Sequence, residues 1–405
     1  MTSTTRTIFV LLAFAAPLFL AGCGKSNCPT TSLTQSGGAN GGAINTGGTV
    51  CGSGTIGGGP SAAFVFYLDQ SGVETASLGT NGSFTQVTGI TPATPAGTSA
   101  DDMAQLNSKF VYIPFSDTNS VQALAINNST GALSSITGSP YKLPGGTAEA
   151  VAVDPKGRFL FVGSESLGPI SVFQIASDGS LTLTPGSPFT SSNLISADSL
   201  AVDGQGRFLY VGQSSSLTPI DVFTIDQNTG ALSELGPFKL GVAQLHADPS
   251  GSFLLGVAEI PDNFSVATDQ HIYVFSIDQT TGVPSPVAGS PFTTSGAPFD
   301  FIIHSNGKFV YTTEITPGGG SLTPIEGFQL DTTTGALTAL TGSPFAGLMG
   351  AYCKMDPNGG SLFCDPNNAG GGFTVFSVNS TTGAVTKTVT PLVVPNLPFA
   401  WTVAN

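Results

Sequence analysis

The chain has 405 residues, of which only 11 are basic and 25 are acidic, and its formal net charge is −14. Because a typical soluble domain is about a quarter charged, a long charged coiled coil is excluded. The excess of acids also argues against a protein that neutralises phosphates with Lys and Arg, so we expect no nucleic-acid partner. Hydrophobic residues make up 40% of the chain, which is enough for a substantial core.

Residues 1–22 have the pattern of a cleaved export signal. Arg6 precedes an apolar run, Ile8–Leu20, that is short for a membrane-spanning helix and is followed by small residues. The Leu-Ala-Gly-Cys motif ending at Cys23 resembles the bacterial lipobox, which implies lipidation of Cys23; the alternative is an ordinary secreted protein. Gly24 stands where an Asp would indicate the inner membrane. We therefore expect an exported protein of the cell envelope, held at the outer membrane by the lipid on Cys23.

Residues 23–60 are rich in Gly, Ser and Thr and cannot bury enough apolar surface to fold. We interpret them as a flexible tether between the lipid and a globular part, residues 61–405. Exported cysteines are able to pair. We expect Cys28 to pair with Cys51, and Cys353 with Cys364 across a hairpin, with free thiols as the alternative for both pairs.

The globular part is an internal repeat, marked first by a turn of the Thr-Gly-Ala-Leu type. Glycine suits such hairpin turns because they need positive φ. The turn glycines lie at positions 82, 131, 179, 230, 282, 335 and 383, so the unit is 48 to 53 residues long.

Each unit also contains a strand rich in aromatic residues after a polar turn, such as Phe208-Leu209-Tyr210-Val211. A second segment follows, such as Ile220–Ile225, in which side chains of two kinds alternate along the chain. Alternation between turn residues is typical of strands. With an inner strand before the aromatic one, each unit has four strands. The sequence therefore predicts an all-β fold, a seven-bladed β-propeller of four-stranded blades.

The first blade lacks an inner strand, because only tether precedes Phe64. The segment 398–405 matches the inner strand at 298–305 position for position. We predict that this C-terminal strand completes the first blade and closes the ring, which covers exposed strand edges.

Aligning the units places one column of residues at the start of the inner strands, around the top mouth of the central channel. Its acidic members are Asp102, Glu149, Asp198 and Asp300, and we take these as candidate ligand- or cation-binding residues. Ca²⁺ is the cation that such oxygens suit, although no metal ligand set is evident and no cofactor is predicted. The alternative is that these acids only accept N–H bonds between neighbouring blades.

Basic residues are expected elsewhere: Arg158, Arg207 and Lys354 are predicted to lie in bottom turns. The top face should then be strongly negative. His246 and His304 fall late in inner strands, and we expect structural or surface roles for them.

The strand Gly-Arg-Phe-Leu-Tyr-Val at 206–211, the Thr-Gly-Ala-Leu turns and the Gly-Ser-Pro-Phe joints together resemble the lactonase-type seven-bladed propellers. The family includes propeller-type 6-phosphogluconolactonases and Tyr-Val-Thr-Asn repeat proteins. The resemblance implies metal-independent opening of a lactone ring by His, Arg and Glu near the channel mouth. Glu165 and Glu314 are the candidate catalytic acids, but the column contains neither His nor Arg.

Two functions therefore stay open. The lipid anchor, the tether and the missing cationic residue favour a non-enzymatic binding platform, whose partner is a protein, a glycan or a small molecule, and we expect a monomer. The family resemblance implies a divergent lactone hydrolase, a carboxylic ester hydrolase.

Overall fold

The computed structural model describes residues 61–405, except 70, 80–82, 89–93, 166–167, 192, 214–218, 259–266, 366–371, 388–391, 394–397 and 399. These residues belong to one compact unit, Gly57–Asn405. The predicted signal, tether, Cys23, Cys28 and Cys51 lie outside the described residues.

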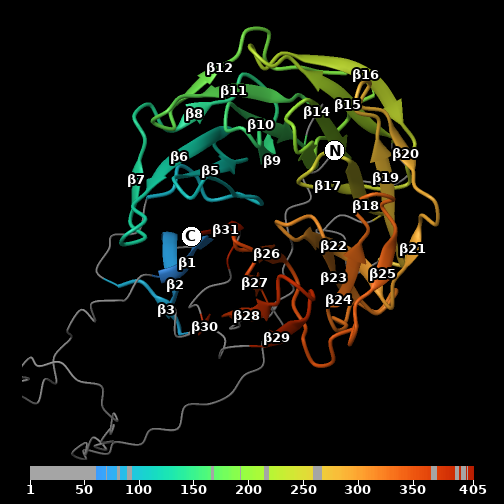
Figure 1. Ribbon diagram of the computed structural model, residues 1–405. Coiled ribbons are helices and arrows are strands. Elements are labelled where there is room, and N and C mark those ends of the chain that lie inside the picture. The colour runs from blue at the N-terminus through green and yellow to red at the C-terminus, as the bar shows by residue number, and fades with distance from the viewer. Residues whose placement is uncertain are drawn as a thin grey trace, which may run out of the picture. The chain divides into compact units, whose positions relative to one another are not determined.

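The described residues form strands and no helix, in seven antiparallel sheets that are the seven predicted blades (Figure 1). From the innermost strand outward, blade one has β31 (Ala400–Ala404), β1 (Ser61–Asp69), β2 (Gly72–Gly79) and β3 (Phe84–Gln86); blade two has β4 (Ala104–Leu106), β5 (Phe110–Phe115), β6 (Ser120–Ile126) and β7 (Leu133–Ser135); blade three has β9 (Ala148–Val153), β10 (Phe159–Ser164), β11 (Ser171–Ile175) and β12 (Leu181–Leu183); blade four has β13 (Ser199–Val202), β14 (Phe208–Gly212), β15 (Ile220–Ile225) and β16 (Leu232–Phe238); blade five has β17 (Gln244–Ala247), β18 (Phe253–Val257), β19 (His271–Ile277) and β20 (Pro284–Pro286); blade six has β22 (Ala297–Ile303), β23 (Phe309–Ile315), β24 (Glu326–Leu330) and β25 (Leu337–Ala339); and blade seven has β26 (Cys353–Met355), β27 (Ser361–Cys364), β28 (Gly372–Val378) and β29 (Val385–Lys387). Three two-residue strands pair with the third strand of their blade, namely β8 (Tyr141–Lys142), β21 (Phe292–Thr293) and β30 (Leu392–Val393).

The C-terminal strand closes the ring, as predicted. β31 pairs antiparallel with β1, in a register that runs from Phe64 opposite Ala404 to Leu68 opposite Ala400. Figure 1 shows the red C-terminal strand beside the blue N-terminal one. The first and last strands of the propeller therefore share one blade, and β1 is paired on both of its sides.

The repeated aromatic residue and the repeated turn glycine meet between neighbouring blades. A Cβ on Gly230 of blade four would lie 2.7 Å from the Phe159 ring of blade three, and Gly282 is related to Phe208 in the same way. Gly230 has φ of +74°, so the position needs glycine for both its backbone and its space. These contacts explain why two features of the sequence recur with one period.

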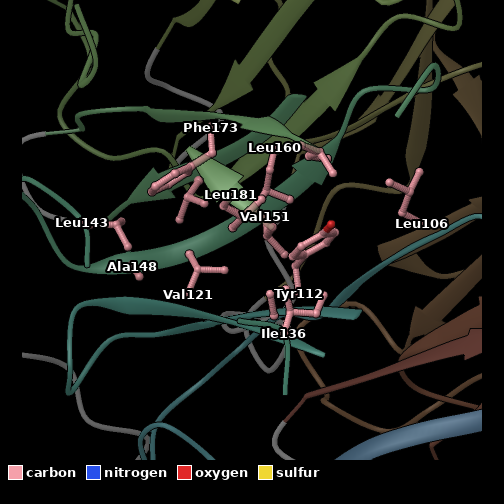
Figure 2. Close-up of a cluster of buried hydrophobic side chains, with 13 residues drawn as sticks. Leu106, Tyr112, Val121, Ile136, Leu143, Ala148, Val151, Leu160, Phe173 and Leu181 are labelled. Atoms are coloured by element: carbon pink, nitrogen blue, oxygen red, sulfur yellow. The ribbon is translucent and has the colours of Figure 1, made fainter. Parts of the chain in front are cut away.

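The hydrophobic core is divided among the interfaces between blades. One buried cluster contains Tyr112 and Val121 from blade two together with Leu160 and Phe173 from blade three (Figure 2). Comparable clusters fill the other interfaces, including the one between blades seven and one, which contains Trp401. Each blade is therefore stabilised by the two beside it.

Candidate functional site

Three of the four acids of the predicted column lie at or near the start of their inner strands, whereas Asp300 lies further along its strand. Asp102 and Asp198 precede β4 and β13, Glu149 is the second residue of β9, and Asp300 is in the middle of β22. The Asp102 carboxylate accepts an N–H bond from Val151 of blade three (3.3 Å), which is the structural role considered as an alternative. The Ser196 hydroxyl donates to Asp198 (2.6 Å).

Lys354 lies in the channel, so its predicted placement in a bottom turn is wrong. It is the middle residue of the inner strand β26, and its Nζ donates to Asp102 Oδ1 (3.3 Å) and to the Met103 carbonyl (3.2 Å). Its ammonium also lies 5.8 Å from the centre of the Trp401 ring. The ring brings blades seven and two to a common channel, and this juxtaposition cannot be read from a turn motif.

Blades five and six add three further polar side chains. Gln244 Nε2 donates to Asp300 Oδ1 (2.7 Å), and the same nitrogen lies 3.5 Å from His246 Nε2. The His246 ring packs edge-on against Phe301, with centroids 4.8 Å apart. Asp102, Gln244, His246, Asp300 and Lys354 therefore form one group, which we call the channel cluster.

Burial changes the charges of the channel cluster. It raises the pKa of Asp300 to about 7, although the N–H of Phe301 and the charge of Lys354 act in the opposite direction. The His246 side chain is exposed, but the protein atoms packed around it remove enough solvent to lower the pKa of its imidazole to about 4, against the opposite effect of Asp102. His246 is therefore neutral at pH 7, and Asp300 is only partly ionised.

The channel is consequently less negative than the column of acids predicts. Asp102 is paired with Lys354, and Asp300 carries part of a charge. His246 and Lys354 were not among the predicted site residues, but the sequence contains a signal for them. Each stands three residues after a position of the predicted column, namely Ala243 and Ala351.

The two candidate catalytic acids do not form a pair, because Glu165 follows β10 of blade three and Glu314 is in β23 of blade six. Glu165 is exposed. Glu314 was expected in a top loop, but it is completely buried within its strand. Its Oε2 accepts the N–H of Gly296 (2.7 Å), so a substrate in the channel does not meet this carboxylate.

The two arginines of the described chain are held in bottom turns, as expected. Arg158 and Arg207 form salt bridges of 2.7 and 2.8 Å with Asp154 and Asp203, whose side chains are fully buried. The Asp203 carboxylate also accepts the N–H of Phe208 (3.0 Å). These four residues stabilise turns and are not free to bind a ligand.

The remaining candidates have structural surroundings. Cys353 and Cys364 stand opposite each other on β26 and β27 and form a disulfide. His304 is buried at the bottom turn of blade six, where its Nδ1 accepts the N–H of Asn306 (3.0 Å). In the part of the chain that the structure describes, no three side chains of His, Cys, Asp or Glu are grouped to hold a metal ion.

A depression at the β28–β29 hairpin is a weaker candidate than the channel. It is lined by Ser377, Asn379 and Thr381 among others and has no charged side chain in its lining. No helix in the described ranges is long and apolar enough to span a bilayer. The titratable side chains thus make the channel, and not this depression, the candidate site.

The fold defines the class of seven-bladed β-propellers, here with polar side chains on the inner strands of several blades. Within this class, the family model described as "Lactonase, 7-bladed beta-propeller" matches residues 104–242. The resemblance to lactonase-type propellers is therefore confirmed, with the model covering about a third of the chain. No curated protein sequence matches the chain.

Solved structures extend the likeness in fold to most of the chain. A Bacteroides uniformis protein, provisionally assigned as a 6-phosphogluconolactonase, has a TM-score of 0.63 and 20% identity over 85% of this chain and 100% of its own. A Bacteroides fragilis protein with the same provisional assignment has 0.59 and 18% over 85% and 98%. The periplasmic gluconolactonase of Pseudomonas aeruginosa has 0.60 and 14% over 84% and 98%. At these identities the likeness shows the fold alone.

Proposed function

We propose that the protein is an exported, lipid-anchored propeller whose central channel binds a small, uncharged, hydroxyl-rich molecule. The observation that carries the proposal is the channel cluster, in which five polar side chains from blades two, five, six and seven face one space. A small number of convergent polar groups is typical of small-molecule sites. The export signal and the lipid on Cys23 are supported by the pattern of residues 1–23.

The charges of the channel support an uncharged ligand. A phosphate or carboxylate is bound by cations that are free to pair with it. Both described arginines are engaged with buried Asp, and Lys354 is already paired with Asp102. Hydroxyl groups, in contrast, can both donate to and accept from the Gln244 amide, the Asp300 carboxyl and the neutral His246 ring.

Binding is testable through Trp401, which is the single Trp of the chain and lies beside Lys354. Residues 24–405, which retain the whole Gly57–Asn405 unit, would be titrated with glucose, glucono-δ-lactone, glucose 6-phosphate and glucosamine. We expect the two neutral sugars to change Trp401 fluorescence, and Lys354→Met to weaken binding about tenfold. Lys308→Met, at an exposed bottom turn, is the matched control and should bind normally. A tighter phosphate or amine ligand would refute the ligand class, and no response from any ligand would refute the site.

Hydrolysis of a lactone is a second candidate function, favoured by Asp300 and Lys354. An ionised Asp300 would take a proton from a water molecule as its oxygen bonds to the lactone carbonyl carbon. The Lys354 ammonium would stabilise the resulting oxyanion. Cleavage of the ring C–O bond, with return of the proton to the ring oxygen, would give the hydroxy acid.

Acid release from glucono-δ-lactone tests this reaction. If Asp300 is the base, kcat/KM should rise with pH through about 7, the value to which burial raises its pKa. Asp300→Asn should lower kcat/KM by about 10²–10⁴ and Lys354→Met by about 10²–10³. Turnover at the spontaneous rate by folded protein would leave binding as the function.

Anchoring is tested separately by metabolic labelling with a radioactive fatty acid in a bacterial host. Label should be incorporated into the full-length chain and into Cys28→Ser, but not into Cys23→Ser. Label in the Cys23 variant, or no label in any chain, would contradict the predicted lipid anchor.

A further inference from the structure

In several blades, a short segment precedes the inner strand, and we call it the lead-in segment. Polar side chains from the same blade hold this segment by hydrogen bonds. In blade two, Gln122 accepts the N–H of Ala96 (3.0 Å) and donates to the Thr94 carbonyl (2.8 Å). In blade four, Gln213 accepts the N–H of Ile195 (2.9 Å) and donates to the Asn193 carbonyl (3.2 Å). These side chains satisfy backbone groups of each lead-in segment, which fixes its position.

Blade six holds its lead-in segment with two carboxyl groups. Glu326 Oε2 accepts the N–H of Ser295 (2.8 Å), and Glu314 Oε2 accepts the N–H of Gly296 (2.7 Å) and the Ser295 hydroxyl (3.2 Å). Thr312 donates to the other oxygen of Glu314 (2.5 Å). Two consecutive N–H groups of the segment are therefore divided between two acids.

The blade-six pair differs chemically from its counterpart in blade four. There, the Gln213 amide lies beside the buried acid Asp221, with Nε2 3.3 Å from Oδ2, and an amide can always donate. In blade six the corresponding partners, Glu314 and Glu326, are both acids, and they lie side by side because they accept N–H bonds from the consecutive residues Gly296 and Ser295. A carboxyl group donates only when it is protonated, so a hydrogen bond between these two acids requires a proton on the pair.

The surroundings favour that proton. Glu314 and Glu326 are both buried, and burial, followed by the charge of Glu326, raises the pKa of Glu314 to about 8. On blade five, Asp269 and His271 contact each other (2.5 Å) on either side of Gln270, and Gln270 donates to the Ser295 carbonyl. Glu326 is the charged group that acts on Glu314.

The lead-in segment is connected to the channel through an irregularity in β22. Pro298 stands opposite Glu314 and Asp300 stands opposite Thr313, so the register shifts at Phe299. Such bulges re-aim neighbouring side chains. A displacement of Ser295 and Gly296 would therefore be transmitted to Asp300 in the channel cluster.

We propose that Glu314 and Glu326 share one proton, which holds the Thr294–Gly296 segment and thereby positions Asp300. Loss of the proton places two negative charges on adjacent strands, and their repulsion releases the segment. Glu314 and Glu326 are positioning residues, and they make the channel sensitive to alkaline pH. We call the two acids and the Thr294–Gly296 segment that they hold the clamp. The effect of the clamp on ligand binding rests on the proposed function of the channel, whereas the clamp itself does not.

Hydrogen exchange of the Thr294–Phe301 backbone between pH 6 and 9, corrected for the intrinsic pH dependence, tests the clamp without a ligand. We expect at least tenfold faster corrected exchange at pH 9 than at pH 6 in the natural protein. Glu314→Gln, which reproduces the amide–acid pair of blade four, should abolish this increase at Ser295 and Gly296, whose N–H groups the two acids accept. Glu326→Gln offers the same test if the first variant does not fold.

Gln213→Glu is the matched control, because it creates an acid–acid pair in blade four. It should introduce the same pH dependence at Asn193–Ala197 and leave Thr294–Phe301 as in the natural protein. Equal pH profiles in the natural and Glu314→Gln proteins would overturn the proposal.

Ligand affinity measured through Trp401 at the same pH values tests the link to Asp300. It should fall with the loss of protection in the natural protein and fall less steeply in Glu314→Gln, where only the ionisation of Asp300 changes the channel. If the corrected exchange depends on pH as expected but the protein binds none of the sugars, the proposed function is refuted and the proposal for Glu314 and Glu326 stands.

Discussion

Replacing Trp401 by Ala should remove much of the stability that ring closure provides. Trp401 is in β31, opposite Tyr67 of β1, and its side chain is 5% exposed. Its ring packs edge-on against Phe373, with centroids 4.9 Å apart, and lies beside the Lys354 ammonium. The side chain therefore joins the C-terminal strand to both blade one and blade seven.

The magnitude follows from the buried area. A buried aromatic side chain removes about 150–250 Å² from water, which at about 25 cal/mol per Å² is worth about 4–6 kcal/mol as an upper bound. Core Trp-to-Ala substitutions cost about 3–5 kcal/mol. The contact with Lys354 adds about 0.5–1 kcal/mol. We expect Trp401→Ala to lower the free energy of unfolding by about 4 kcal/mol, a large share of a typical total of about 5–15 kcal/mol.

Urea denaturation followed by far-ultraviolet circular dichroism is the suitable assay, because the variant has no Trp for fluorescence. Trp401→Phe retains an aromatic contact with Phe373 and should cost about half as much. Leu183→Ala, at a side chain that is 37% exposed, should change stability by about 0.5 kcal/mol or less. A loss below about 1 kcal/mol for Trp401→Ala, with an unchanged denaturant slope, would refute the role of this side chain in closing the ring.

Three further outcomes are expected. Because the pKa of Glu314 is raised to about 8 in the folded protein, its contribution to the free energy of unfolding is complete below about pH 4.5 and is lost as the pH rises to about 8, by at most about 5 kcal/mol. Urea titrations at several pH values should show this fall in stability. A Glu314→Gln protein with the same fall would contradict the prediction. Asp203→Ala leaves the N–H of Phe208 without its acceptor and should cost about 2–4 kcal/mol in thermal unfolding, whereas a cost under about 1 kcal/mol would contradict the structural role of this acid. Lys354→Met should raise the pKa of His246 above about 4, because the ammonium disfavours the imidazolium; NMR titration of the three histidines measures this directly, and an unchanged value would remove Lys354 from the channel cluster.

The fold was predictable from the sequence because each repeat carries its own local signals. Turn glycines need positive φ, and alternating residues make strands with two distinct faces, so seven similar segments predict seven similar blades. The closing strand was predictable because the segment at 398–405 matches the inner strand at 298–305, while the first blade has no inner strand before Phe64. These are properties of short stretches of chain, which a single sequence displays.

The site was predictable only in part. The column of acids was located by counting from the repeated Phe, and Asp102 and Asp300 do reach the channel. Lys354 was assigned to a turn because it precedes a turn motif, and Glu314 was assigned to a loop although its strand runs through it. A repeat shows where a residue lies within its blade, but not which residues of other blades it meets.

The sequence by itself therefore determined the number of blades, the strand order within each blade and the closure of the ring, since each depends on local pattern or on a missing partner. The tertiary structure decided which charges pair, because Lys354 and Asp102 are 252 positions apart and meet only across the channel. It also decided the protonation of Asp300, His246 and Glu314, because a pKa depends on the burial and neighbouring charges that the assembled ring creates.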